Sequence, residues 1–249
     1  MQLQSLRRRS ETANQFFALS LSLVCVALLT GCWSDVSRGE QLNEVVIEGD
    51  GKTKFVAEIW TDNWFSMHVN GKPLHEDSVP YKTERSFNAE RVTFSASFPM
   101  TLSFEFRDFM ENDTGLEYIG SRRQQMGDGG AIVQMRRARV DKPLITSNGA
   151  WKCLVVHRAP LDRACVDVKN PAVGIGACLA KISTLPDGWT RPDFNDGKWP
   201  NATVHSKSAV SPKFGYDRVD WNSDAKFIWG PDLQRDNIVL CRVKLNAPS

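Results

Sequence analysis

Two stretches, VTFSASF at residues 92–98 and LSFEF at residues 102–106, decide the fold class of this 249-residue chain. In both, apolar residues alternate with polar or small ones, which is the period of a β-strand with one buried face. The phenylalanines fall on one side of each stretch, so we expect two half-buried strands joined at Pro99-Met100. From residue 45 onward, no run of apolar residues spaced by three and four predicts a helix.

A hairpin is expected just before these strands. Residues 64–69 run into Asn70-Gly71, a strong hairpin signal because a type I′ turn needs positive φ at both central residues. Lys72-Pro73-Leu74 must start the returning strand, since Pro73 cannot donate to a central ladder. Further strands are expected at residues 53–59, 116–119, 131–135, 151–157 and 238–245.

These patterns predict one all-β domain over residues 45–249, a single antiparallel β-sandwich with long loops and little helix. The longest loop, residues 108–130, is polar and carries NDTG and GDGG turns. Long ordered loops are often functional, so this one is a candidate for binding.

The N-terminus has the organisation of an export signal. Arg7, Arg8 and Arg9 precede an apolar run at residues 16–29, which is shorter than the ~20 residues that span a bilayer. The run ends in Leu-Thr-Gly-Cys32, which resembles the lipobox of bacterial lipoproteins; the alternative is a plain secretory signal. The resemblance implies a signal peptide at 1–31, lipidation of Cys32 and a tether at 32–44.

That anchor would place the protein in the bacterial cell envelope, attached to a membrane through its acyl chains. Trp33 follows Cys32 where an aspartate would retain a lipoprotein in the inner membrane, so the outer membrane is preferred. The 31 basic and 29 acidic residues give a net charge of +2, so we expect no nucleic-acid partner.

The cysteines fit an oxidising compartment. Without Cys25 and Cys32, four remain: Cys153, Cys165, Cys178 and Cys241. An even number in an exported chain predicts two disulfides, with three pairings open, and residues 165–178 have the composition of a disulfide-held loop. Zinc is the alternative, but the short C-x₂₋₄-C spacing is missing.

Two segments resemble galactose-binding-like (jelly-roll) β-sandwich domains, which occur beside the catalytic domains of rhamnosidases and related glycosidases. WTDNWFSMHVNGK at residues 60–72 is similar to their "ADD-y-x-l-y-V-N-G-k" hairpin, and WTRPDFNDGKWPNA at 189–202 to their "DFDDSSWPxA" segment. AKFIWG at 225–230 and LCRV at 240–243 resemble the turn and strand that follow. The hairpin precedes the second segment here, whereas it follows it in the family, which implies a permuted or heavily inserted sandwich.

The resemblance implies sugar binding, which needs an aromatic platform surrounded by polar groups. Two sequence clusters supply such residues, although alternate members of the first must belong to the core. The candidates are Trp60, Asp62, Asn63 and Trp64, followed by Asp77, Tyr81, Glu84 and Arg85.

Calcium is the one cofactor left open. Asp193, Asn195 and Asp196 could ligate it, but their spacing is not the D-x-[DN]-x-[DN]-G of a calcium loop. We favour Asx-turns that fix the local backbone.

No H-E-x-x-H, G-x-S-x-G or P-loop motif is present, so no catalytic residue is assigned. The resulting hypothesis is a lipid-anchored, non-catalytic carbohydrate-binding module of the cell envelope. A protein-interaction or envelope-assembly lipoprotein is the first alternative. A glycoside hydrolase or other secreted hydrolase is the second, because its carboxylate pair would assemble only in the fold.

Overall fold

The computed structural model describes residues 42–49, 51–83 and 88–247, all within one compact unit. The expected signal peptide, Cys32, Glu84 and Arg85 lie outside the described residues. Within those ranges, no helix has the length and apolar character needed to cross a bilayer.

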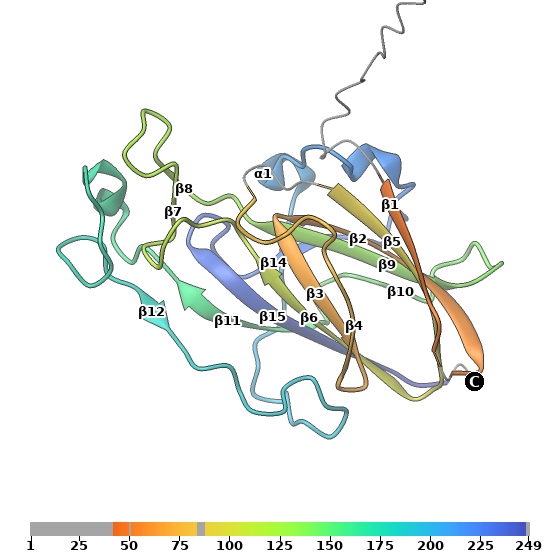
Figure 1. Cartoon of the computed structure of the whole chain (residues 1–249). Coiled ribbons are helices and arrows are strands. Elements are labelled where there is room, and N and C mark those ends of the chain that lie inside the picture. Colours follow the sequence, from red (N-terminus) through yellow and green to blue (C-terminus); the bar gives the residue numbers. More distant parts are fainter. Residues whose placement is uncertain (1–41, 50, 84–87, 248–249) are drawn as a thin grey trace, which may run out of the picture. The chain divides into compact units, whose positions relative to one another are not determined.

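Two β-sheets form the domain (Figure 1). Nearly all strand pairs are antiparallel, the exception being the parallel pair β1–β5. The first sheet has the order β1 (Leu42–Ile47), β5 (Asn88–Ala96), β2 (Thr53–Asp62), β9 (Gly130–Arg137), β14 (Phe227–Trp229), β13 (Thr203–His205), with β10 (Ile145–Thr146) paired to β9. The second has the order β12 (Lys181–Ile182), β11 (Lys152–Arg158), β15 (Asp236–Leu245), β6 (Met100–Arg107), β3 (Trp64–Val69), β4 (Lys72–Glu76).

The remaining elements are short. β7 (Leu116–Glu117) and β8 (Gln125–Met126) make a small hairpin inside the long loop. Among the described residues, helix is confined to α1 (Lys207–Val210) and two 3-10 turns, η1 (Arg163–Asp167) and η2 (Tyr216–Arg218). The prediction of an all-β sandwich with little helix is confirmed, although β1 begins at Leu42, inside the segment assigned to the tether.

One apolar core fills the space between the sheets. Phe55 and Phe94 contribute from the first sheet, and Phe104 and Phe106 from the second. The rings of Phe104 and Phe106 stack with centroids 5.4 Å apart. Burial of aromatic side chains contributes roughly 25 cal/mol per Å², so this layer supplies most of the drive to fold.

The expectation of a half-buried strand at residues 102–106 is wrong, because β6 is buried on both faces. On its second face, Ser103 Oγ donates to Thr190 O at 3.5 Å, and in the same segment Trp189 and Trp199 pack against Leu240 of the neighbouring strand β15. The fully buried Arg242 donates from Nε to Asp196 Oδ2 (2.9 Å) and from Nη2 to Arg191 O (3.1 Å). The segment therefore supplies hydrogen-bond partners for Arg242, a charged residue that the apolar–polar alternation of β15 would place on a solvent-exposed face.

Two local predictions are confirmed. Asn70 and Gly71 have φ of 51° and 84° and connect β3 to β4, the last strand of its sheet, where Pro73 is tolerated. Two disulfides form: Cys153–Cys241 joins β11 to β15, and Cys165–Cys178 closes the expected loop.

We predict that removing the two disulfides has unequal effects on stability. They span 88 and 13 residues, and loop-closure entropy assigns them about 4.5 and about 3 kcal/mol respectively. The double Cys→Ala variant at Cys153 and Cys241 should therefore lose more free energy of unfolding in urea than the variant at Cys165 and Cys178. Equal losses, or the reverse order, would contradict this account.

Candidate functional site

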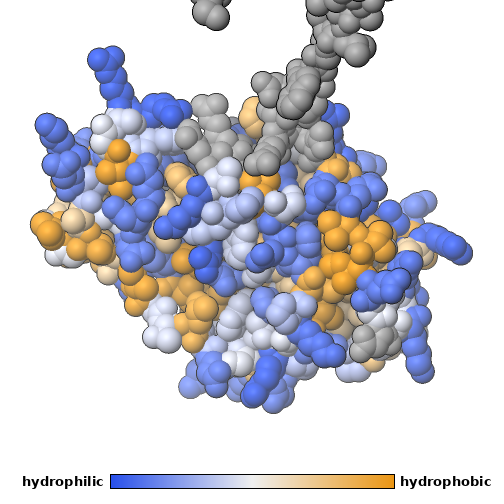
Figure 2. Space-filling view, viewed as in Figure 1, coloured by the Kyte–Doolittle hydropathy of each residue, from blue (hydrophilic) through white to orange (hydrophobic). Residues whose placement is uncertain are grey.

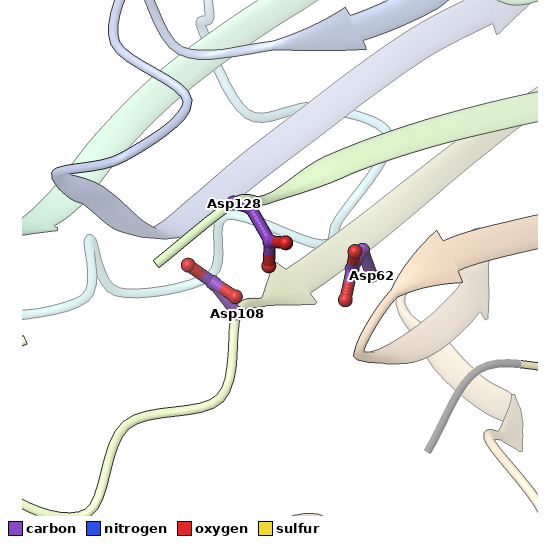
Figure 3. Close-up of side chains that lie close together, drawn as sticks. All are labelled: Asp62, Asp108 and Asp128. Atoms are coloured by element: carbon purple, nitrogen blue, oxygen red, sulfur yellow. The ribbon is translucent and has the colours of Figure 1, made fainter. Parts of the chain in front are cut away.

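Three aspartates from both sheets meet at one end of the sandwich, where their strands begin or end (Figure 3). Asp62 ends β2, Asp108 directly follows β6, and Asp128 lies two residues before β9. Each offers a carboxylate oxygen, and these oxygens all lie within 4.8 Å of one another. Because β2 pairs with β9 so that Asp62 faces Gly130, sheet register itself brings two of the three together.

Two of these carboxylates are isolated from solvent. Asp62 and Asp108 are 0% exposed, and none of their four carboxylate oxygens accepts a hydrogen bond from a residue that the structure describes. Lys213 Nζ lies 2.6 Å from Asp128 Oδ2 and 3.5 Å from Asp62 Oδ2. Burying charge without full compensation is costly, so the cluster needs either protons or a cation.

The electrostatics follow from burial. Desolvation raises the pKa of Asp62 well above its usual value, and the Asp128 carboxylate raises it further. Desolvation also raises the pKa of Asp108, with added repulsion from Glu117, Asp62 and Asp128. Burial lowers the pKa of Lys213, but the neighbouring carboxylates outweigh this effect and leave it raised. The site thus has a strongly negative field that favours positive charge.

Backbone contacts hold this cluster in place. A Cβ on Gly127 would lie 1.7 Å from Asp108 Oδ2, so any larger residue would force the Asp108 carboxylate or the long loop to shift. Asn63 Oδ1 accepts from the Phe109 amide at 2.5 Å, and the Tyr81 hydroxyl donates to Asp108 O at 3.2 Å. Asn63 and Tyr81, both predicted ligand contacts, thereby shape the turn that carries Asp108.

An aromatic pair lies beside the cluster. The rings of Trp64 and Tyr81 are 5.9 Å apart, and the Arg107 guanidinium lies 5.4 Å and 5.0 Å from their centroids. The structure therefore places Asp62, Asn63, Trp64 and Tyr81 at one end of the sandwich, where Asp62 and Asn63 are buried and do not face a sugar ligand.

Trp60 requires a correction, because it is a core residue and not part of an exposed platform. It is fully buried, its Nε1 donates to Phe214 O at 2.9 Å, and it packs edge-on against Tyr216 and Phe227. The segment that contains α1 and η2 covers this side of the first sheet, which alternation along β2 could not reveal.

The residues considered for calcium have other partners. Asn195 Oδ1 accepts from the Gly197 amide at 3.0 Å, as expected of an Asx-turn. The Asp196 carboxylate pairs with Arg242, and Asp193 with Arg191 at 3.4 Å. These contacts hold the segment against the second sheet.

A second feature is a polar groove of about 310 Å³ on the outer face of the first sheet. Its floor includes Glu58 of β2, Arg91 of β5 and Gln134 of β9, and Trp221 forms part of its wall. Glu58 accepts from Arg91 Nε at 2.9 Å and from Gln134 Nε2 at 2.7 Å. These side chains are fixed before any ligand arrives, and the sequence patterns pointed to none of them.

Searches of protein-family models, curated proteins and solved structures return no significant match to this chain. Its function is therefore inferred from its own residues.

Asp77 provides a prediction about pH. Burial raises the pKa of Asp77 to about 8, well above its ordinary value of 3.8. Between these values the folded chain holds a proton that the unfolded chain has lost, so this group makes stability fall as pH rises, by up to about 1.4 kcal/mol per unit.

Asp77→Asn should remove that contribution, because an amide does not titrate in this pH range. The amide oxygen can still accept the hydrogen bond from the Val79 amide. Urea unfolding at pH 5 and pH 8 should show the variant gaining free energy of unfolding relative to wild type at the higher pH. A difference that stays constant with pH would mean that Asp77 is already ionised in the folded chain.

Proposed function

We propose that this chain is a lipid-anchored, non-catalytic carbohydrate-binding module of the bacterial cell envelope, and that the groove beside Trp221 receives the sugar. The charged segment, apolar run and Cys32 at the N-terminus support the export and the anchor. The two disulfides support an oxidising compartment.

The chemistry of the groove is the observation that carries the proposal. A sugar presents an apolar ring face and a rim of hydroxyls, which match an indole beside carboxylate, amide and guanidinium groups. Trp221 is half-buried, stacks on Tyr216 with centroids 5.8 Å apart and donates from Nε1 to Tyr216 O. A ring held in this way loses little freedom on binding.

The size and the contacts of the groove favour a short saccharide. Its volume is at the lower end of the ~300–1,000 Å³ typical of small-molecule pockets. Asn222 and Arg136 add an amide and a second guanidinium to the lining. Such a shallow polar site supports micromolar or weaker affinity, roughly −8 kcal/mol.

Hydrolysis fits the geometry less well. Asp62 and Asp108 are fully buried, so a sugar could not touch them. Their nearest oxygens, together with that of Asp128, lie within 4.8 Å of one another, which is shorter than the spacing of inverting glycosidases (about 6.5–9.5 Å) and close to that of retaining ones (about 5–5.5 Å). Burial, rather than spacing, is therefore the argument against hydrolysis at this cluster. In the groove, Glu58 is already engaged by Arg91 and Gln134.

A protein partner is the second candidate, favoured by one surface. Ile175, Leu179, Ile182 and Leu185 are all exposed within eleven residues, and β12 is the short last strand of its sheet. Figure 2 shows apolar side chains breaking an otherwise polar surface on this face of the domain. Clustered aliphatic groups at a sheet edge are typical of interaction surfaces.

We predict that the purified full chain binds a subset of neutral or acidic glycans on an array, and that Trp221→Ala weakens binding by about tenfold or more through lost stacking. Trp64→Ala, which alters the aromatic pair at the end of the sandwich, is the matched control and should retain affinity. Arg136→Ala removes one groove cation and should also weaken binding.

Loss of glycan binding in Trp64→Ala but not in Trp221→Ala would place the binding site at the Trp64–Tyr81 pair instead of the groove. No binding by the folded wild-type chain would overturn the carbohydrate proposal and favour the protein partner.

A further inference from the structure

We infer that Asp62, Asp108 and Asp128 form a calcium site at one end of the sandwich. The site is separate from the 193–196 segment and independent of the carbohydrate proposal. It would join the ends of three strands, β2, β6 and β9, that belong to both sheets.

The donor set selects the class of metal. All three ligands are carboxylate oxygens, which suit hard cations such as Ca²⁺ and Mg²⁺ rather than zinc or copper. Calcium–oxygen distances are about 2.3–2.6 Å, so two ligands of one calcium ion lie at most roughly 4.6–5.2 Å apart. The 4.8 Å limit observed here fits that span. Magnesium, with ligands at about 2.0–2.1 Å, demands near-octahedral geometry and is usually held by one or two carboxylates plus water, so three converging carboxylates suit calcium better.

The second observation is the state of the buried oxygens. Asp62 and Asp108 are completely buried, and none of their four carboxylate oxygens accepts a well-formed hydrogen bond from a described residue. The Lys213 ammonium, 3.5 Å from Asp62 Oδ2, is a longer ionic contact. Other buried carboxylates in the described chain accept at least one hydrogen bond: Glu90 accepts from Ser78, Asn88 and Asn43, and Asp77 accepts from the Val79 amide through Oδ1, although its Oδ2 has no partner. Oxygens without donors that converge on a common point are what a bound cation would satisfy.

Charge balance points to a divalent ion. Three carboxylates and the Lys213 ammonium sum to −2, which one Ca²⁺ neutralises. Glu117 lies close enough to raise the pKa of both Asp62 and Asp108, so it adds to the negative field. Lys213 pairs with Asp128 and Asp62 and thus compensates only part of the charge.

An entry path is present at Asp128. Its side chain is 40% exposed, whereas the other two ligands are sealed. An ion can therefore arrive from solvent beside Asp128 and keep water as remaining ligands, since calcium takes six to eight oxygens. Both Asp108 and Asp128 lie in the long loop at 108–130, so calcium would fasten both of its ends to the end of β2.

The alternative is a cluster that stays neutral by retaining protons, with no role for metal. The two cases differ in what an aspartate-to-asparagine change does. In both, Asp108→Asn removes a buried acid and the metal-free chain should remain at least as stable. Only a calcium site predicts that Asp108→Asn also abolishes the binding heat and the rise in Tm that calcium produces in the wild-type chain.

The test is isothermal titration calorimetry of the full chain, stripped with EDTA and desalted, with CaCl₂ and in parallel with MgCl₂. We expect one calcium per chain, weaker magnesium binding and a higher Tm in calcium. Asp108→Asn and Asp128→Asn should each weaken calcium binding by about tenfold or more, because each removes a charged ligand. Asp193→Asn is the matched control and should bind like wild type.

The inference is overturned if wild type shows neither heat nor a Tm increase in millimolar calcium. It is also overturned if Asp193→Asn loses the response while Asp108→Asn keeps it, or if magnesium binds more tightly than calcium. Each result can be read separately from the glycan array, because Trp221→Ala leaves these three ligands unchanged.

Discussion

The stacked pair Phe104–Phe106 on β6 is the contact on which the remaining structure depends. Phe104 lies 5.7 Å from the ring of Trp151 and Phe106 lies 6.1 Å from that of Trp229, so one strand packs on aromatics from several parts of the chain. A strand slip by one residue would turn both phenylalanines away from the core, which fixes the register of β6. Once the register is fixed, so is the position where β6 ends, and Asp108 is the next residue.

The same constraint makes the carboxylate cluster unfavourable for the stability of the folded chain. Asp62 and Asp108 follow strand residues that must be buried, so they enter a region without water. A domain selected only for stability would place neutral residues there, because replacing buried charges with apolar groups is often neutral or stabilising. Glycine at position 127, which lets the loop approach Asp108, is a second local cost at the same place. Two such costs coincide at one site, a pattern typical of functional sites.

The sequence predicted local structure better than it predicted which distant residues come together in space. Alternation identified β5, β6, β9, β11 and β15, and Asn70-Gly71 identified the turn, because each signal depends on neighbouring residues. It did not reveal that residues 189–199 pack beside β6 and β15 or that α1 and η2 cover Trp60, since alternation distinguishes two faces without saying what lies on either. Asp62 was a candidate, but Asp108 and Asp128 come from distant positions that meet only through strand pairing. The groove likewise depends on three adjacent strands that are far apart in sequence.

The groove and the carboxylate cluster are connected through shared strands. On β2, Glu58 in the groove and Asp62 in the cluster are four residues apart, about 13 Å at a strand rise of roughly 3.3 Å per residue. On β9, Gln134 lies four residues beyond Gly130, the partner of Asp62. A cation bound at the ends of these strands would therefore share two strands with the groove floor, where Gln134 Nε2 donates to Glu58 Oε2. Binding free energies are linked reciprocally, so any factor by which calcium raises glycan affinity is also the factor by which glycan raises calcium affinity.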